Sequence, residues 1–193
     1  MQRIDAVVHC VMSLNARTVL DLGCGEGAAL LKLVCKDQIS RILGIDKIDE
    51  PLDRIRRQLD RETDEIGRKA ELRRASFLDL DETFAGFDVA ILIETIEHID
   101  PARLSLLEQS VFGNAAPEAV IITTPDRDQN ARLGVPPHRF RHPDHRFEWG
   151  RRKLEKWAAG VARRWQYNFH VEGLSTSHSL DAGATQMVVF RKA

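Results

Sequence analysis

The sequence VLDLGCGEG, residues 19–27, decides the fold, because an apolar strand pattern runs directly into a glycine-rich turn. Glycines let a backbone approach a ligand closely, and a helix predicted over residues 28–35 begins at once. A second apolar strand over residues 41–45 completes a βαβ unit and ends at Asp46. An acid about 20 residues after such a turn can bind ribose hydroxyls. The unit predicts a nucleotide-like cofactor, and the turn alone fits a nicotinamide cofactor as well as S-adenosylmethionine.

Strand and helix patterns alternate along the rest of the chain. An amphipathic helix from Ile4 to Met12 leads into the first strand. The charged stretch 54–74, whose charges nearly cancel, is predicted to be a solvated helical face. The alternation predicts a single α/β domain over residues 1–193, with a doubly wound, mostly parallel seven-stranded sheet and helices on both faces. The predicted strands are 18–22, 41–45, 72–78, 87–93, 119–124, 166–171 and 186–191, and the helices include 28–35, 51–60, 101–112 and 151–164.

The composition bounds the class of protein. Of 193 residues, 43% are hydrophobic and 30% are charged, as in a soluble globular protein, and the net charge is -1. So small a net charge excludes a protein that binds nucleic acid over its whole surface, and any such contact must come from a local patch. The cysteines form no C-x-x-C pair, and no apolar run has the length of a membrane span. We therefore expect a cytoplasmic protein with free thiols and no membrane contact.

The polar segment ETIEH, residues 94–98, follows the apolar strand predicted over residues 87–93. If the chain turns into a helix here, Glu94, Glu97 and His98 share a face and can bind a divalent ion together. The inverted zinc-protease motif H-x-x-E-H does not fit, because Glu94 stands where that motif needs histidine. The alternative is a pair of carboxylates that makes only helix-cap and surface contacts.

The long segment 126–150 has three prolines and little periodicity, and it leaves the fifth predicted strand at the same edge of the sheet. Loops of this length in compact domains are often functional. The segment contains FRHPDHRFEW, residues 140–149, which can reach the Glu94 group. We therefore expect the loop 126–150 to contribute to the site.

The glycine turn, in its context, resembles that of the class I S-adenosylmethionine-dependent methyltransferases. The resemblance rests on Asp21, which is separated from the first glycine by Leu22, on a third glycine at Gly27, and on final strands that look antiparallel. It covers the whole chain and implies that Asp21 lies near the methionine end of the cofactor, while Asp46 holds the ribose. The implied cofactor-binding residues are Asp21, Gly23, Gly25, Asp46, Ser76, Phe77 and Asp79, the last three beside the adenine.

The two later motifs resemble a narrower family, the small-RNA 3′-terminal ribose 2′-O-methyltransferases, whose catalytic domain pairs E-x-x-E-H with a later F-R-x-x-D-H-x-F-E-W. Both motifs are present in order. The resemblance implies a Mg²⁺ or Mn²⁺ ion that bridges the two hydroxyls of the terminal ribose. Its ligands, which are also the implied catalytic residues, are Glu94, Glu97, His98 and His145. The chain departs from the family at Gly150, where threonine is usual, which leaves the start of the next helix in doubt.

The implied substrate is RNA with a free 3′ end, either small regulatory RNA in gene silencing or cleaved tRNA in RNA repair, and DNA is not expected. An end-healing kinase and ligase are partners that only the resemblance suggests. Residues 127–153 hold eight basic and three acidic residues, so the loop 126–150 is expected to supply RNA contacts as well as a metal ligand. Phe140, Phe147 and Trp149 can stack on a base, although Phe147 and Trp149 also fit a role as core anchors. His142 fits a loop hydrogen bond as well as a substrate contact.

The implied chemistry explains why a metal is expected. A ribose hydroxyl is a weak acid, so its attack on a sulfonium methyl group needs the activation and orientation that a bound ion supplies. Mixed nitrogen and oxygen ligands favour manganese over magnesium. The proton acceptor is either an imidazole of the site or a metal-bound hydroxide. Three other functions stay open: a small-molecule methyltransferase, a non-enzymatic nucleotide- or metal-binding regulator, and a nicotinamide-dependent oxidoreductase.

Overall fold

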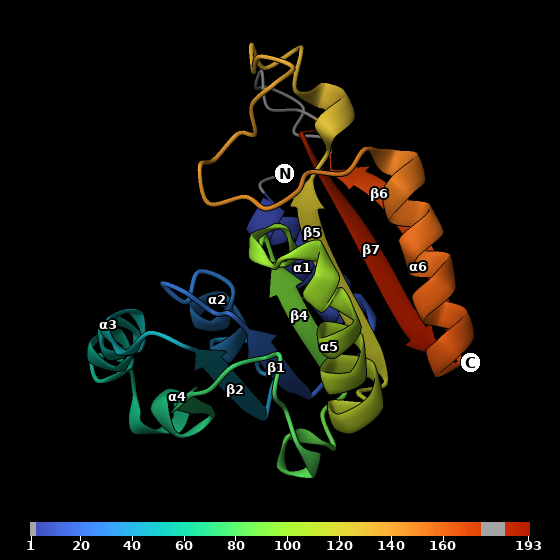
Figure 1. Ribbon diagram of the computed structural model, residues 1–193. Coiled ribbons are helices and arrows are strands. Elements are labelled where there is room, and N and C mark those ends of the chain that lie inside the picture. The colour runs from blue at the N-terminus through green and yellow to red at the C-terminus, as the bar shows by residue number, and fades with distance from the viewer. Residues whose placement is uncertain (1–2, 175–183) are drawn as a thin grey trace.

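A seven-stranded sheet forms the centre of the computed structural model, which describes residues 3–174 and 184–193 (Figure 1). The strand order is β3-β2-β1-β4-β5-β7-β6. The first five strands in chain order are parallel, whereas β7 runs antiparallel to both β5 and β6. This confirms the doubly wound, mostly parallel sheet that the sequence predicts. The strands are β1 (Thr18–Leu22), β2 (Arg41–Asp46), β3 (Ala70–Arg74), β4 (Val89–Ile93), β5 (Ala119–Pro125), β6 (Tyr167–Leu174) and β7 (Thr185–Lys192).

Helices cover both faces of the sheet, because the central strands bury side chains on both sides. Val19 and Ile91 pack in the core with α1, α2 and α3, whereas Leu20 and Leu92 pack with α5 and α6. Burial on both faces explains why β4 and β5 are nearly continuous apolar runs in the sequence. No helix in the described part of the chain is long and apolar enough to cross a membrane. The α-helices are α1 (Arg3–Ser13), α2 (Leu30–Val34), α3 (Asp49–Leu59), α4 (Asp64–Arg68), α5 (Leu104–Glu108) and α6 (Arg151–Trp165).

Short helical turns connect these elements. Four have 3-10 geometry and one, η4, has π geometry. The predicted helix 101–112 divides into η3, α5 and η4, because the chain leaves regular α-helix at its end and Ala116 N–H bonds to the Val111 carbonyl, five residues back. The turns are η1 (Glu82–Phe84), η2 (Ile96–His98), η3 (Pro101–Arg103), η4 (Gln109–Ala115) and η5 (Arg127–Gln129).

The region between α3 and β4 differs from its prediction. The sequence predicts the third strand at 72–78, but β3 ends at Arg74, because the Ser76 hydroxyl accepts a hydrogen bond from Leu78 N–H and turns the chain. The stretch 54–74 is not one helical face. A new helix, α4, begins after Thr63, whose side chain accepts from Ile66 N–H, and β3 then occupies the end of the stretch. Charge pattern alone does not reveal this break.

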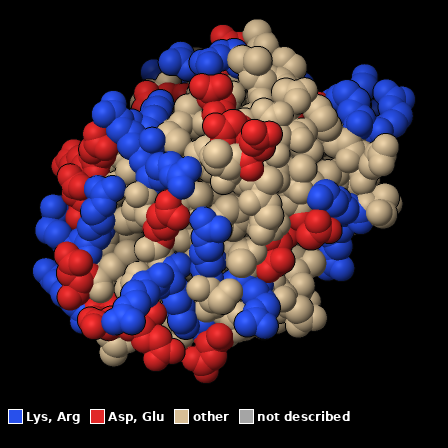
Figure 2. All heavy atoms as spheres, turned by 90° about the horizontal axis from the view of Figure 1, so that it is seen from below, with Lys and Arg blue, Asp and Glu red and all other residues tan. Residues whose placement is uncertain are grey.

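The carboxyl ends of the parallel strands meet at one edge of the sheet, the upper edge in Figure 1. The loop 126–150 leaves β5 there and runs over this edge before it enters α6 (Figure 1). The molecule seen from below, toward the opposite edge, carries basic and acidic side chains intermingled (Figure 2). Ligand binding in a doubly wound sheet is therefore expected at the upper edge.

Candidate active site

The cofactor turn, residues 23–27, is held against the end of β2. Gly23 N–H and Cys24 N–H both donate to the Ile45 carbonyl, at 2.9 and 3.0 Å. Gly23, Gly25 and Gly27 have φ values of 75°, 50° and 76°, a left-handed conformation that glycine adopts without a steric penalty. The sequence thus places glycine where the backbone must turn back on itself.

Two carboxylates face this turn. Asp46 accepts hydrogen bonds from Gly25 N–H and from Ile48 N–H, both at 3.0 Å, which fixes the acid that is predicted to hold the ribose. Asp21 is 3% exposed, and burial, with a smaller effect of the nearby Asp46 charge, raises its pKa to about 7. The cofactor turn is therefore lined by one half-buried acid, Asp46, and one buried acid, Asp21.

The segment predicted beside the adenine lies partly at the turn. A Cβ atom on Gly23 would lie 3.4 Å from the Phe77 ring, so Phe77 reaches the cofactor turn. Ser76 and Asp79 are exposed, and Asp79 N–H donates to the Ser76 carbonyl within their own turn. The structure thus brings Phe77 to Gly23, while the roles of Ser76 and Asp79 remain predictions.

The ETIEH segment follows β4, but it does not form the α-helix considered from the sequence. Glu94 has a positive φ of 50°, and the short 3-10 turn η2 then carries Glu97 and His98. Glu94 N–H donates to the Thr123 hydroxyl, and that hydroxyl donates to Glu94 Oε1 at 3.0 Å. Arg3 from α1 forms an ion pair with Glu94 Oε2 at 3.4 Å, a contact that no sequence pattern indicates.

Glu97 is the most deeply buried acid of this segment, with 0% exposure. Its Oε2 accepts from the Thr124 hydroxyl at 3.0 Å, whereas its Oε1 is buried and has no hydrogen-bond partner in the described part of the chain. Burial, and then the Glu94 charge, raises the pKa of Glu97 to about 8. An unpaired buried carboxylate oxygen is costly unless a cation or a donor compensates it, so this residue fits a metal ligand.

The pKa shifts of Glu94 and His98 also fit a metal site. Burial raises the pKa of Glu94, against the opposing charge of Arg3. Burial lowers the pKa of His98, and the nearby His145 lowers it further. The Arg3 charge therefore does not outweigh the effect of burial on the two carboxylates, while the His98 imidazole favours the neutral form that binds metals.

Three histidines converge at this edge of the sheet. One nitrogen from each of His98, His142 and His145 lies within 4.8 Å of the other two, whereas Glu94 and Glu97 are not among the residues whose ligand atoms lie this close together. The ring centroids of His98 and His145 are 4.9 Å apart, and His142 lies 5.6 Å from His145 and 6.0 Å from His98. The structure thus adds His142 to the predicted set. We call Glu94, Glu97, His98, His142 and His145 the Glu-His cluster.

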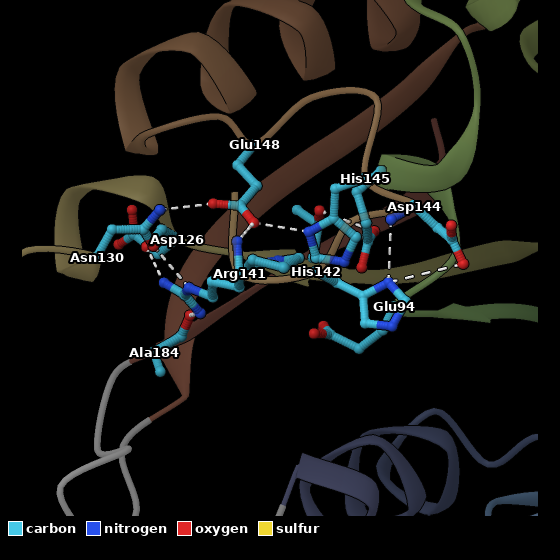
Figure 3. Close-up of polar contacts among 12 residues, drawn as sticks. Glu94, Asp126, Asn130, Arg141, His142, Asp144, His145, Glu148 and Ala184 are labelled. Atoms are coloured by element: carbon cyan, nitrogen blue, oxygen red, sulfur yellow. Dashed lines mark hydrogen bonds and ion pairs between the residues drawn. The ribbon is translucent and has the colours of Figure 1, made fainter. Parts of the chain in front are cut away.

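The loop 126–150 delivers His145 through a buried polar network (Figure 3). Glu148 Oε1 lies 2.6 Å from His145 Nδ1 and accepts Arg141 N–H at 2.7 Å, and Glu148 Oε2 accepts the Asn130 amide at 2.6 Å. The Arg141 guanidinium donates to the Asn130 side-chain oxygen and to the carbonyls of Asp126 and Ala184. Arg141 is one of the basic residues from which RNA contacts are expected, but its hydrogen bonds hold the loop together.

The aromatic residues of the loop divide between two roles. Phe147 and Trp149 are 5% and 6% exposed, and their rings stack with centroids 4.3 Å apart. They anchor the loop in the core, which was one of the two roles considered. Phe140 is exposed, and the Arg127 guanidinium lies 5.8 Å from its ring centre. Only Phe140 of the three stays open to solvent for stacking.

Known proteins match this chain over its whole length. A family model described as a methyltransferase domain matches residues 19–112. A small RNA 2′-O-methyltransferase of Gallus gallus is 32% identical over 99% of this chain and 53% of its own length. The methyltransferase domain of bacterial CtHen1-C is 34% identical, covers 100% of this chain and 97% of its own, and superposes with a TM-score of 0.86. The small RNA methyltransferase HEN1 has the same TM-score at 27% identity, with 25% of that chain covered.

The sheet order and the glycine turn with its acids define a class I S-adenosylmethionine-dependent methyltransferase domain. Within that class, the chain belongs to the small RNA 2′-O-methyltransferase family. It spans about half the length of the curated vertebrate relatives that it matches.

Proposed function

We propose that this domain transfers a methyl group from S-adenosylmethionine to the 2′-hydroxyl of the 3′-terminal ribose of RNA, with a divalent Mg²⁺ or Mn²⁺ ion held by the Glu-His cluster. The observation that carries the proposal is Glu97, whose buried Oε1 has no hydrogen-bond partner among the residues that the structure describes and lies within the influence of the Glu94 charge. His98 follows Glu97 in η2, and His98 and His145 belong to the convergent histidines. These four residues supply two carboxylates and two imidazoles, a donor set that suits manganese better than magnesium.

The position of the cluster suits methyl transfer. A Cβ atom on Gly23 would lie 3.0 Å from the Thr95 side chain, so the ETIEH segment touches the cofactor turn. The methyl donor and the cluster would therefore meet at one edge of the sheet, where a short distance favours an in-line attack. A divalent ion held by these side chains would supply Lewis-acid activation of a ribose hydroxyl. Glu94 and Glu97 supply the charge that keeps such an ion at this edge.

Exposed cationic side chains of the loop and of the start of α6 would bind the phosphates of the RNA backbone. Three exposed arginines of the loop have side chains with no salt-bridge or hydrogen-bond partner among residues 3–174 and 184–193: Arg132, Arg139 and Arg146. The same holds for the side chain of Arg152, at the start of α6. Contacts of this kind bind phosphates without regard to sequence. They are compatible with small regulatory RNA and with cleaved tRNA, and in the second case an end-healing kinase and ligase would act on the same RNA.

The test compares four RNAs that differ only at the 3′-terminal ribose: a diol, a 2′-deoxy end, a 3′-deoxy end and a 3′-phosphate. Methyl transfer from labelled S-adenosylmethionine is measured with Mn²⁺ present. We expect rapid labelling of the diol, none of the 2′-deoxy end, and poor labelling of the last two, because each lacks one chelating hydroxyl. Equal labelling of all four RNAs would exclude the terminal 2′-oxygen as the acceptor.

A further inference from the structure

Glu148 is a buried carboxylate whose contacts all come from hydrogen-bond donors. It is 3% exposed and lies between the backbone of Arg141, the amide of Asn130 and the ring of His145 (Figure 3). The Arg141 N–H and the Asn130 amide nitrogen can only donate, and each faces a different oxygen of Glu148. Both oxygens of Glu148 therefore act as acceptors.

The direction of each hydrogen bond in this network is determined by Arg141. Its Nε–H can only donate, so the Asn130 side-chain oxygen must face it at 2.6 Å. The Asn130 amide nitrogen then faces Glu148 Oε2 and donates to it. Since Arg141 N–H also donates to Oε1, Glu148 must act as an acceptor at both oxygens. A glutamine amide would place N–H groups against one of these donors.

The same logic determines the ring of His145. Glu148 Oε1 lies 2.6 Å from Nδ1 of His145, so a neutral ring carries its proton on Nδ1 and leaves Nε2 unprotonated. Nε2 lies on the side of the ring away from Glu148, and the His98 ring stands 4.9 Å from the His145 ring. Because the His145 side chain is 8% exposed, the surrounding loop leaves little room for the ring to turn.

The network is tied to the sheet at its other end. The Arg141 guanidinium bonds to the carbonyls of Asp126 and Ala184, which directly follow β5 and precede β7. Arg146 N–H donates to the Glu97 carbonyl at 2.7 Å, which joins the loop to η2. The loop thus places His145 relative to Glu97 through rigid elements on both sides.

We propose that Glu148 is a positioning residue, which acts through His145 by fixing its tautomer and its ring orientation so that Nε2 faces the Glu-His cluster. The proposal rests on the proposed function for the identity of the ion, but the tautomer can be tested without any ion. Partners of this kind, which hold a metal-binding histidine through its other nitrogen, typically change metal affinity by about 10- to 100-fold when they are replaced.

The first arm measures Mn²⁺ binding by the loss of the free Mn²⁺ electron paramagnetic resonance signal. The Glu148→Gln variant is compared with wild type and with Glu108→Gln, a matched control. Glu108 is also buried and accepts from Trp157 and Arg164, but it lies between α5 and α6, outside the cluster. We expect the affinity to fall by about 10- to 100-fold in Glu148→Gln and to stay unchanged in Glu108→Gln. Equal losses of Mn²⁺ affinity in the two variants would contradict the proposal, because they would show that Glu148 has only a structural role.

The second arm asks whether Glu148 acts through His145. In a double-mutant cycle, Glu148→Gln should cost little further Mn²⁺ affinity once His145 is alanine. Additive losses would contradict the proposal. If Glu148→Gln does not fold, as judged by circular dichroism, Glu148→Asp retains the charge and withdraws it from His145, so a smaller loss of affinity is expected.

The third arm records long-range ¹H–¹⁵N spectra of the neutral His145 ring in the metal-free protein. Wild type should show the proton on Nδ1, and Glu148→Gln should show a mixture of the two tautomers. A wild-type ring protonated on Nε2 would overturn the inference even if Mn²⁺ binds. If wild type binds no Mn²⁺ but keeps its proton on Nδ1, the proposed function fails while the positioning of His145 stands.

Discussion

The cofactor turn and the Glu-His cluster lie at the same edge of the sheet but are assembled in different ways. The turn is local: β1, residues 23–27 and the end of β2 lie within one βαβ unit, and Asp46 bonds directly to Gly25. The cluster joins η2 to His145 of the loop 126–150, and the position of His145 depends on Glu148, Arg141 and the hydrogen bond from Arg146 N–H to the Glu97 carbonyl. The first site is a property of a motif, whereas the second depends on how two distant segments pack.

This difference predicts that the two sites can be separated by mutation. Replacing His145 by alanine should lower methyl transfer to RNA by at least about 100-fold, because the proposed ion would lose a ligand, with no change in S-adenosylmethionine affinity. Conversely, Asp46→Ala should weaken S-adenosylmethionine binding by roughly 10- to 100-fold and leave Mn²⁺ affinity intact. Calorimetric titration of each variant with each ligand checks this, and a loss of both affinities in either variant would contradict it.

Gly23 is the position at which the separation of the two sites should be weakest, because it belongs to the cofactor turn and lies next to the ETIEH segment that carries Glu94, Glu97 and His98. A Cβ atom there would lie 3.0 Å from Thr95 of the ETIEH segment, at a φ of +75°. Gly23→Ala should therefore cost about 1 to 3 kcal/mol of stability and weaken S-adenosylmethionine binding. Gly86→Ala is the matched control, since Gly86 has a φ of +84° with nothing within 4 Å of the added Cβ. Urea unfolding should show a loss of stability in both variants. Titration with S-adenosylmethionine should show weaker binding only in Gly23→Ala.

Asp21 should make the stability of the cofactor-free protein depend on pH. Its pKa is raised from 3.8 to about 7 in the folded state, mainly by burial, so the folded protein binds its proton more tightly than the unfolded chain does. The stability from this group is fully present below 3.8 and is lost as pH rises through about 7. Asp21→Asn should therefore lose less stability than wild type between pH 5 and 7.5 in urea unfolding. Identical slopes in the two proteins would exclude a buried, protonated Asp21.

The smallest effect is expected at the exposed arginines of the loop. Arg139→Ala should weaken RNA binding modestly and reduce the slope of log affinity against log salt by about 0.7 to 0.9, the contribution of one phosphate contact. Arg163→Ala, in the last turn of α6, is a control that should leave the slope unchanged. Filter binding at several salt concentrations provides the measurement, and an unchanged slope in Arg139→Ala would remove this residue from the RNA contact.

The fold and the cofactor turn could be predicted because their signals are local. Strand periodicity, three glycines and Asp46 lie within one short unit, and the structure keeps them together. β3 was misplaced because edge strands are half-buried and their ends are decided by turns such as that at Ser76. The arrangement of Arg3 against Glu94 could not be predicted, since nothing in the sequence of α1 indicates which acid it will meet.

The Glu-His cluster shows a similar limit. The two motifs identify Glu94, Glu97, His98 and His145, and their spacing suggests an α-helix that begins at Glu94. In the structure, a positive φ at Glu94 and the 3-10 turn η2 orient the side chains instead. The motif FRHPDHRFEW includes Glu148 but does not indicate its role, and no sequence pattern points to Asn130. Hydrogen-bond direction across a loop depends on tertiary contacts, which a single sequence does not specify.

The most direct test of the account measures methyl transfer from labelled S-adenosylmethionine to a short RNA with a free 3′ end, with and without Mn²⁺, after the protein has been stripped of metal with a chelator. Wild type should label the terminal 2′-oxygen only when Mn²⁺ is restored, and Glu97→Gln should stay inactive at the same Mn²⁺ concentration while it still binds S-adenosylmethionine. Equal labelling with and without the ion, or full activity of Glu97→Gln, would contradict a metal-dependent mechanism built on the Glu-His cluster.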